Sequence, residues 1–338
     1  MVAPPAPDKR IVASLLDQME DGREFASLVD VVPESLNLRE EIRRALADIE
    51  QVRKRPVLLY AANLIMTAPE VPVGIVLGDD LPFAEMVAAV ASEAAAVDIV
   101  IVTPGGLAQQ VSLFVDRLRP RFHDVGFIVP HMAMSAGTIW ALSGNEIWMD
   151  ERAFLGPIDP QVPGKDGRLL PGQALLRLLQ RIQETGAELL KKGQQPPWTD
   201  IQLLHALDPK EIGNVLAYSQ YSIQLASSYL EAHKFRDWRH HRDGRPVTPS
   251  EKSLRAKEIA EKLCAHDIWN VHSNGISREA AWNTLQIRID HPENSPALHR
   301  GLRRLWALLY WAFDNTSMVK VFLSQNYALF RARQGATP

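Results

Sequence analysis

The sequence contains very little cysteine: Cys264 is the single example in 338 residues. One thiol cannot form an internal disulfide, and it is too few for a metal site built on thiolates. Cys264 lies in a segment with helical spacing, 254–265, where a lone cysteine is more often a small buried apolar residue than a nucleophile. The scarcity of cysteine is typical of a reducing compartment. We therefore expect a cytoplasmic protein.

Long apolar runs and a strong charge of one sign are also missing. No stretch reaches the roughly 18 to 20 apolar residues of a membrane-spanning helix. Residues 1–9 are rich in proline and alanine with no apolar run behind them, so they do not resemble a signal peptide. The net charge is −3, which provides no general attraction to nucleic acid. We expect neither a transmembrane segment nor a nucleic-acid partner.

Cofactor motifs are missing as well. No Gly-x-Gly-x-x-Gly follows an expected strand, and no lysine stands out for a pyridoxal Schiff base. Asp79 and Asp80 lie at an expected strand-to-helix turn, where acidic residues more often cap the helix than bind a metal. The most basic segment, 235–246, includes His240 and His241, but aspartates interrupt it and a solvated loop is the favoured interpretation. The sequence predicts no cofactor and no metal site.

The chain does have a dense series of strand and turn signals between residues 99 and 161. Short apolar runs at 99–102 and 125–129 predict strands, and each leads into a small-residue turn that opens a helix, TPGG at 103–106 and SAGT at 135–138. Such pairs are βα units, and ligands gather outside the carboxyl ends of strands in open α/β sheets. Both turns are therefore expected at one edge of a parallel sheet.

These two turns carry the parts of an acyl-transfer site. Gly105 and Gly106 have no β-carbon, so their amides are free to face outward and bind an anion. Ser135 is expected where a helix begins, in a turn of small residues. Acyl transfer needs a hydroxyl nucleophile and two backbone N–H groups aimed at the carbonyl oxygen. The alternative is that Pro-Gly-Gly is an ordinary strand end and that Ser135 is only an N-cap.

This pattern resembles the Clp-protease/crotonase-type fold, which occurs in the Clp protease proteolytic subunit and in signal peptide peptidase A. It is more closely similar to the serine dehydrogenase proteinase family. The likeness spans residues 36–290 and is dense only between 102 and 161. The segments that carry it are IVPHMAMSAGT (128–138), ALSGNEI (141–147) and LGPIDPQ (155–161).

The resemblance implies a fold and a site. The implied fold is α/β, a ββα superhelix with a parallel sheet and an added helical C-terminal region. The implied site has Ser135 as nucleophile, with the backbone amides of Gly106 and Ala136 as the oxyanion hole. A peptide or protein is the implied substrate. Proteases of this fold usually assemble into rings or stacks, so we expect a homo-oligomer. The apolar helix at 301–313 suits either core packing, which is the favoured interpretation, or a subunit interface. No dehydrogenase activity is carried over.

Three parts of the chain are expected. Residues 1–55 form an N-terminal tail and helices, 56–195 form the catalytic core, and 196–338 form a helical part that packs on the core. Within the core, the apolar run at 73–77 predicts a strand, and the alanine-rich stretch at 82–95 predicts a helix that packs on the sheet.

The general base for Ser135 is the open question, because a serine hydroxyl needs a neighbouring group to take its proton. The Clp subunit carries a histidine where this chain reads Pro-Ile-Asp-Pro, and stomatin-associated relatives carry a lysine where the best register gives Gln173. The remaining candidates are Asp159, Lys165 and His272. Asp159 is a base only if burial raises its pKa, and Lys165 must be desolvated. His272 has a suitable intrinsic pKa but lies far along the chain.

Two functions therefore stay open. The first is a serine hydrolase, a peptidase that forms an acyl-enzyme at Ser135. The second is a non-proteolytic member of the fold, either a peptide-binding scaffold or an enzyme that polarises an acyl-thioester carbonyl. The absence of the usual histidine or lysine favours the second. The serine itself favours the first, because an oxyanion hole alone needs no hydroxyl.

Overall fold

The computed structural model describes residues 14–32, 37–65, 72–163 and 169–333. A central six-stranded sheet has the order β10-β9-β1-β2-β3-β5. Neighbouring strands among β1, β2, β3 and β5 run parallel, whereas β9 is antiparallel to β1 and β10 is antiparallel to β9. The protein is thus α/β with a mostly parallel sheet, as the sequence predicts. The bounds are β1 Val57–Ala62, β2 Ala96–Val102, β3 Asp124–Val129, β5 Glu146–Met149, β9 Met318–Leu323 and β10 Ala328–Ala332.

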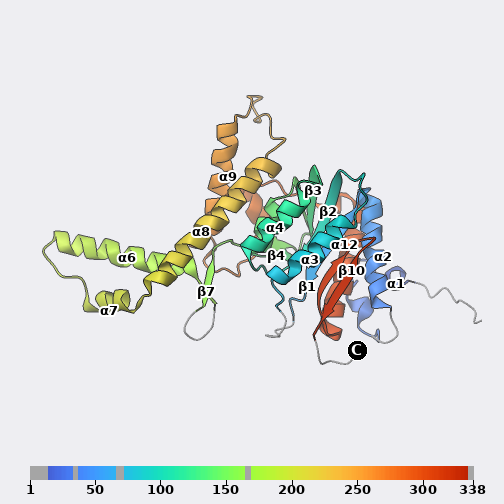
Figure 1. Cartoon of the computed structure of the whole chain (residues 1–338), viewed down its shortest axis with the longest axis horizontal. Coiled ribbons are helices and arrows are strands. Elements are labelled where there is room, and N and C mark those ends of the chain that lie inside the picture. Colours follow the sequence, from blue (N-terminus) through green and yellow to red (C-terminus); the bar gives the residue numbers. More distant parts are fainter. Residues whose placement is uncertain (1–13, 33–36, 66–71, 164–168, 334–338) are drawn as a thin grey trace, which may run out of the picture.

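The parallel strands are nearly continuous apolar runs because helices cover both faces of the sheet. Every residue of β1 is buried. Its side chains alternate between two cores: Leu58 and Tyr60 pack with α3, α4 and α5, whereas Leu59 and Ala61 pack with α2 and α12 (Figure 1). The bounds are α2 Leu38–Arg53, α3 Asp80–Ala88, α4 Ala108–Leu118, α5 Ala136–Leu142 and α12 Pro296–Asn315.

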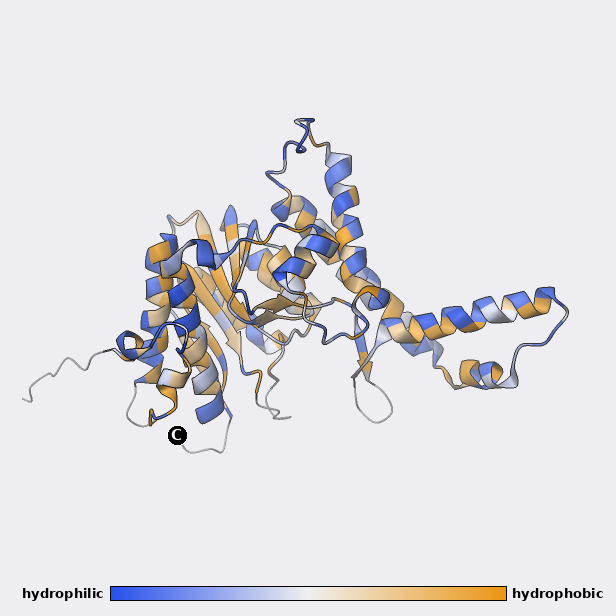
Figure 2. Ribbon diagram, turned by 180° about the vertical axis from the view of Figure 1, so that it is seen from behind, coloured by the Kyte–Doolittle hydropathy of each residue, from blue (hydrophilic) through white to orange (hydrophobic). Residues whose placement is uncertain are grey.

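Two further helices make an antiparallel pair beside this body, and an arm extends from it (Figure 1). The pair is α8 (Pro209–Tyr229) and α9 (Pro249–Cys264). The arm is α6 (Gly172–Lys191) followed by α7 (Trp198–Ala206), and α7 has no buried residue. Figure 2 shows apolar and polar residues alternating along α6, whereas the central strands are largely apolar. No helix in the described ranges is long and apolar enough to cross a membrane.

Short elements complete the described chain. β4 pairs in parallel with β6, and β7 pairs antiparallel with β8. Their bounds, with those of the short helices, are α1 Leu15–Gln18, β4 Met132–Ala133, β6 Phe154–Leu155, β7 Gln161–Pro163, β8 Leu169–Pro171, α10 His266–Trp269 and α11 Arg278–Ala280.

Two predictions in the N-terminal half of the sheet are wrong. Residues 73–77 form no strand: Ile75 alone makes a bridge, to Gly106, and a short 3₁₀ turn begins at Leu77. The helix predicted over 82–95 ends at Ala88. Alanine favours helix locally, but this segment must turn back toward the start of β2, and that tertiary requirement overrides the propensity.

The last part of the chain contains strands that the sequence did not predict. β9 lies directly beside β1, with Leu59 opposite Leu323 and Ala62 opposite Lys320. The C-terminal segment therefore contributes strands to the central sheet as well as helices that pack on it. The division of the chain at residues 55 and 195 stays a prediction.

A buried carboxylate, Asp79, ties these strands to the body. Its Oδ2 accepts from Lys320 Nζ at 2.7 Å and from the Tyr60 hydroxyl at 2.9 Å, and its Oδ1 accepts from Arg331 at 2.7 Å. Lys320 also donates to Gly74 O at 2.5 Å. Burial and the nearby carboxylate together raise the pKa of Tyr60 well above its ordinary value. One side chain thus joins β1, β9, β10 and the segment that contains Ile75.

Replacing this carboxylate is expected to destabilise the fold strongly. Asp79→Asn leaves the Lys320 ammonium, whose side chain is 1% exposed, without a counter-charge. Removing one partner of a buried pair costs about 3–5 kcal/mol. The adjacent Asp80→Asn breaks only a partly exposed pair with Arg117 and is expected to cost about 0–1 kcal/mol. Urea denaturation measures both, and equal losses would contradict the role given to Asp79.

Candidate active site

Ser135 lies between β4 and α5 in a strained backbone conformation. Its φ is 51° and its ψ is −117°, a region that residues with a β-carbon rarely adopt. The Gly137 N–H donates to Met134 O at 2.7 Å, and the Ile139 N–H donates to Ser135 O at 3.2 Å, which fixes the turn on both sides. The hydroxyl makes no capping hydrogen bond, so the N-cap interpretation of this side chain is wrong. Such strain clusters at functional sites.

The Gly105-Gly106 turn lies against Ser135. Gly105 and Gly106 have φ values of 106° and 141°. A β-carbon added at Gly105 would lie 2.7 Å from Ser135 Cβ and 2.9 Å from Met134 O. The contact is held in place by a β-bridge between Thr103 and Ala133, which lie just before the two turns. The two turns therefore meet at one edge of the sheet, as the sequence predicts.

Two N–H groups in these turns have no acceptor among the described residues. Gly106 bridges Ile75, but the bonds of that bridge run from the Ile75 N–H to Gly105 O at 2.7 Å and from the Leu107 N–H to Ile75 O at 2.9 Å. Ala136 is the first residue of α5, where an N–H has no acceptor within its own helix. Within the described part of the chain, neither the Gly106 nor the Ala136 N–H donates a hydrogen bond.

Asp159 and His272 form a side-chain pair. His272 Nδ1 lies 2.8 Å from Asp159 Oδ1, although the residues are 113 positions apart. Both side chains are largely shielded, at 12% exposed for His272 and 2% for Asp159. The pairing leaves His272 Nε2 for another contact. The sequence named both residues as separate candidates for the base, and the structure brings them together.

The backbone that carries this pair is continuous with the nucleophile turn. Leu155 of β6 pairs with Ala133 of β4 on one side and bridges Ile276 on the other. Thr138 of α5 then clasps the loop: its hydroxyl donates to Gly156 O and accepts from the Gly156 N–H, both at 2.9 Å. The loops that hold Asp159 and His272 are therefore anchored to the strand and helix on either side of Ser135.

The position of the relatives' lysine holds a glutamine, and the third candidate for the base lies outside the described residues. Gln173, in the register of the relatives' lysine, donates to Ser219 Oγ at 2.9 Å and lies 3.6 Å from Cys264 Sγ. Burial and the Asp159 carboxylate raise the pKa of Cys264 to about 12, so this thiol stays protonated at neutral pH. Lys165 lies outside the described residues.

The basic segment at 235–246 is paired with carboxylates inside and outside the segment. Arg236 contacts Asp124 at 2.6 Å, and Arg245 contacts Asp243 at 2.8 Å. His241 Nε2 lies 3.2 Å from Glu251. These contacts agree with the solvated-loop interpretation of the segment.

Sequence reasoning missed the contribution of Ile75 and the pairing of Asp159 with His272. The glycine at Gly74 was the available signal for the first, because a β-carbon there would lie 3.1 Å from Gly105 O. No local signal was available for the second, since a pair between distant loops leaves no periodic pattern in the chain.

The fold and the meeting of these two turns define an α/β protein with a mostly parallel central sheet and a serine turn at its edge. Residues 84–185 match the family described as ClpP-like SDH-type serine proteinase, which confirms the resemblance found in the sequence. The matched segment includes both turns and Asp159.

Similar proteins are found over shorter or more distant matches. The uncharacterized proteins MJ0137 and MJ1495 of Methanocaldococcus jannaschii are 46% and 42% identical over 66 residues. That match spans 20% of this chain and 23% of each relative. Two mutant structures of the 1510-N membrane-bound stomatin-specific protease, one with a substrate peptide, align over 64% of this chain and 70% and 74% of theirs. Their identities are 18% and 17%, with TM-scores of 0.38 and 0.37.

A β-carbon at Gly105 is expected to disturb this site beyond simple backbone strain. Gly105→Ala combines a positive φ with the contact against Ser135, and overpacking plus strain predicts a loss of about 2–4 kcal/mol. Gly244→Ala is the matched control, because Gly244 has a φ of 84° but open space around it, and about 1 kcal/mol is expected. Chemical denaturation measures both variants. A loss for Gly105→Ala no larger than that for Gly244→Ala would contradict the close approach.

Proposed function

We propose that this protein is a serine peptidase that cleaves peptide bonds through an acyl-enzyme at Ser135. The observation that carries the proposal is the strained Ser135 backbone packed against the Gly105-Gly106 turn. A strained backbone conformation costs about 1–3 kcal/mol and persists only where the surrounding structure enforces it. The first turn of an ordinary helix does not require such a conformation. The match of residues 84–185 to a serine proteinase family supports the same assignment.

In the proposed first step, Ser135 Oγ attacks the carbonyl carbon of the substrate peptide bond. The Gly106 and Ala136 N–H groups donate to the oxygen as it becomes negative. Their lack of other acceptors supports this role, because no hydrogen bond must be broken before they bind the oxyanion. Donors that are fixed in advance stabilise the transition state without reorganisation, and losing one typically reduces kcat by about 10²- to 10³-fold.

The proposed base is His272, oriented by Asp159. With the Nδ1 proton donated to Asp159 Oδ1 at 2.8 Å, the neutral imidazole keeps Nε2 as its proton acceptor. Nε2 takes the Ser135 proton and later delivers it to the leaving amine. Asp159 thus serves as a positioning carboxylate and stabilises the imidazolium. This pair supports the peptidase over the acyl-thioester or scaffold alternative, which was favoured by the absence of a base.

A homo-oligomer that shelters the site is part of the proposal. The arm formed by α6 and α7 presents large apolar side chains to solvent, and such patches mark association surfaces. The most exposed examples are Leu190, Trp198, Ile201, Leu203 and Leu204. A peptide substrate and a cytoplasmic location complete the proposal.

Covalent labelling tests the nucleophile. A fluorophosphonate probe is expected to label the folded wild-type chain once, and Ser135→Ala is expected to abolish labelling because the variant lacks the hydroxyl that the probe phosphonylates. Ser143→Ala is the control, since that buried hydroxyl is held by Trp140 O at 2.6 Å and does not face the turns. Intact-mass spectrometry reads the adduct. Absence of an adduct on folded wild-type protein would overturn the proposal.

Substitution of the base is expected to slow acylation without abolishing the fold. Asp159→Asn should reduce the rate of labelling by about 10⁴-fold and His272→Gln by about 10⁶-fold, the losses seen when a triad loses its orienting carboxylate or its base. The exposed His240→Gln serves as control and should label at the wild-type rate. Stopped-time labelling followed by mass spectrometry gives the rates. Unchanged acylation in His272→Gln would exclude His272 as the base.

A further inference from the structure

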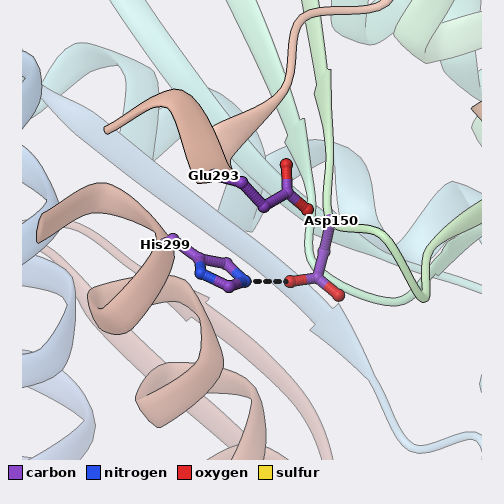
Figure 3. Close-up of side chains that lie close together, drawn as sticks. All are labelled: Asp150, Glu293 and His299. Carbon is purple, nitrogen blue, oxygen red and sulfur yellow. Dashed lines mark ion pairs between the residues drawn. The ribbon is translucent and has the colours of Figure 1, made fainter. Parts of the chain in front are cut away.

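A second group of ionisable side chains converges away from Ser135. Asp150 follows β5, Glu293 lies in a 3₁₀ turn (Pro292–Asn294), and His299 lies in the first turns of α12. Figure 3 shows the three side chains pointing toward one another from these separate elements. One ligand atom of each lies within 4.8 Å of the others. Three protein donors at this spacing are the usual beginning of a divalent-cation site.

Local bonds hold each member of the group in place. The Asp150 N–H donates to Val129 O at 3.1 Å, and the His299 N–H donates to Ser295 O at 3.0 Å. Asp150 Oδ1 accepts from the Arg152 N–H at 3.0 Å and from Arg152 Nε at 3.1 Å. The other oxygen, Oδ2, is thereby turned toward His299. The arrangement is rigid before any ligand binds.

Two buried atoms of the group face each other as a long ion pair without a hydrogen bond (Figure 3). Asp150 Oδ2, on a side chain only 2% exposed, and His299 Nε2 form no hydrogen bond with any described residue. They lie 3.4 Å apart, whereas a charge-assisted N–H···O bond is about 2.7–2.9 Å long. Two ligands that each lie about 2.0–2.1 Å from a tetrahedral zinc ion are about 3.4 Å apart. The spacing therefore suits two ligands of one ion better than a hydrogen bond.

Glu293 completes the group as an oriented carboxylate. Its two oxygens accept from Arg278 at 2.9 and 2.8 Å, and Oε1 also accepts from the Glu151 N–H at 2.9 Å. Carboxylates that bind metal are commonly held by such outer partners. Arg278 also offsets part of the negative charge, so a divalent cation is not needed to hold Glu293 in place. A Glu293 oxygen lies within 4.8 Å of the ligand atoms of Asp150 and His299.

We propose that Asp150, Glu293 and His299 bind a zinc ion that has a structural role. One imidazole nitrogen and two carboxylates match the mixed N and O preference of zinc, whereas magnesium and calcium favour all-oxygen sites with more ligands. The ion joins the end of β5 to the start of α12, and through the Asp150 N–H it reaches the end of β3. Water fills the fourth position. This inference does not depend on the proposed peptidase activity.

Metal titration of the full chain tests the site. After chelator treatment and dialysis, zinc is expected to bind with a 1:1 stoichiometry in calorimetry and to raise the melting temperature by several degrees. Cobalt, bound in the same place, is expected to give the visible absorption of a low-symmetry site with a nitrogen ligand. Loss of a residue that only orients a metal ligand typically weakens metal binding by about 10- to 100-fold. His299→Gln and Asp150→Asn remove ligands themselves and should weaken zinc binding by more than this.

A matched histidine separates this site from adventitious binding. His291→Gln removes an exposed imidazole just before the same 3₁₀ turn and should leave affinity and the cobalt spectrum unchanged. If Asp150→Asn does not fold, His299→Gln decides alone, because its ring nitrogen makes no hydrogen bond and loses only the long ion pair with Asp150. The proposal is overturned if zinc does not bind, or if His299→Gln binds it as tightly as the wild-type chain.

Discussion

The contact between Gly105 and Ser135 is the constraint on which the rest of the site depends. A β-carbon at Gly105 would lie 2.7 Å from Ser135 Cβ, so the two turns can approach only because one of them ends in glycine. The same approach forces Ser135 into a positive φ and leaves the Gly106 N–H without an acceptor in the described chain. Close packing of backbone against backbone thus produces the strain and the free donor together.

Strand β9, near the C-terminal end of the described chain, supports the contact between Gly105 and Ser135. Lys320 of β9 reaches across β1 to both Asp79 and Gly74 O. Gly74 and Ile75 in turn form the wall against which Gly105 and Gly106 lie. The outer side of the Gly105-Gly106 turn makes no contact that could stabilise it if a ligand is to bind there. The buried Lys320–Asp79 ion pair supports the turn from the inner side, through Gly74. The unpredicted strands are therefore part of the support for the candidate site.

Much of the sheet could be predicted because its strands are short apolar runs between turns, and the strand predicted at 125–129 is β3, Asp124–Val129. β9 was missed because Lys320 interrupts an otherwise apolar run, and its burial depends on Asp79, 241 positions away. The two turns were predicted from glycine and small-residue chemistry, which is local. The pair formed by Asp159 and His272 could not be predicted, because it depends on how distant loops meet across β6. The strand predicted at 73–77 failed because Ile75 has a single bridging partner.

The pairing of β9 with β1 also has a consequence for biosynthesis. β1 leaves the ribosome early, yet Leu59 meets Leu323 only after almost the whole described chain has been made. Until then one edge of the nascent sheet is open and Asp79 has neither of its cationic partners. Contacts of such long sequence separation form late in folding. The support that Lys320 gives to Gly74 behind the Gly105-Gly106 turn is therefore completed last. In a truncated or incompletely synthesised polypeptide, the turn lacks this support and is less rigidly held.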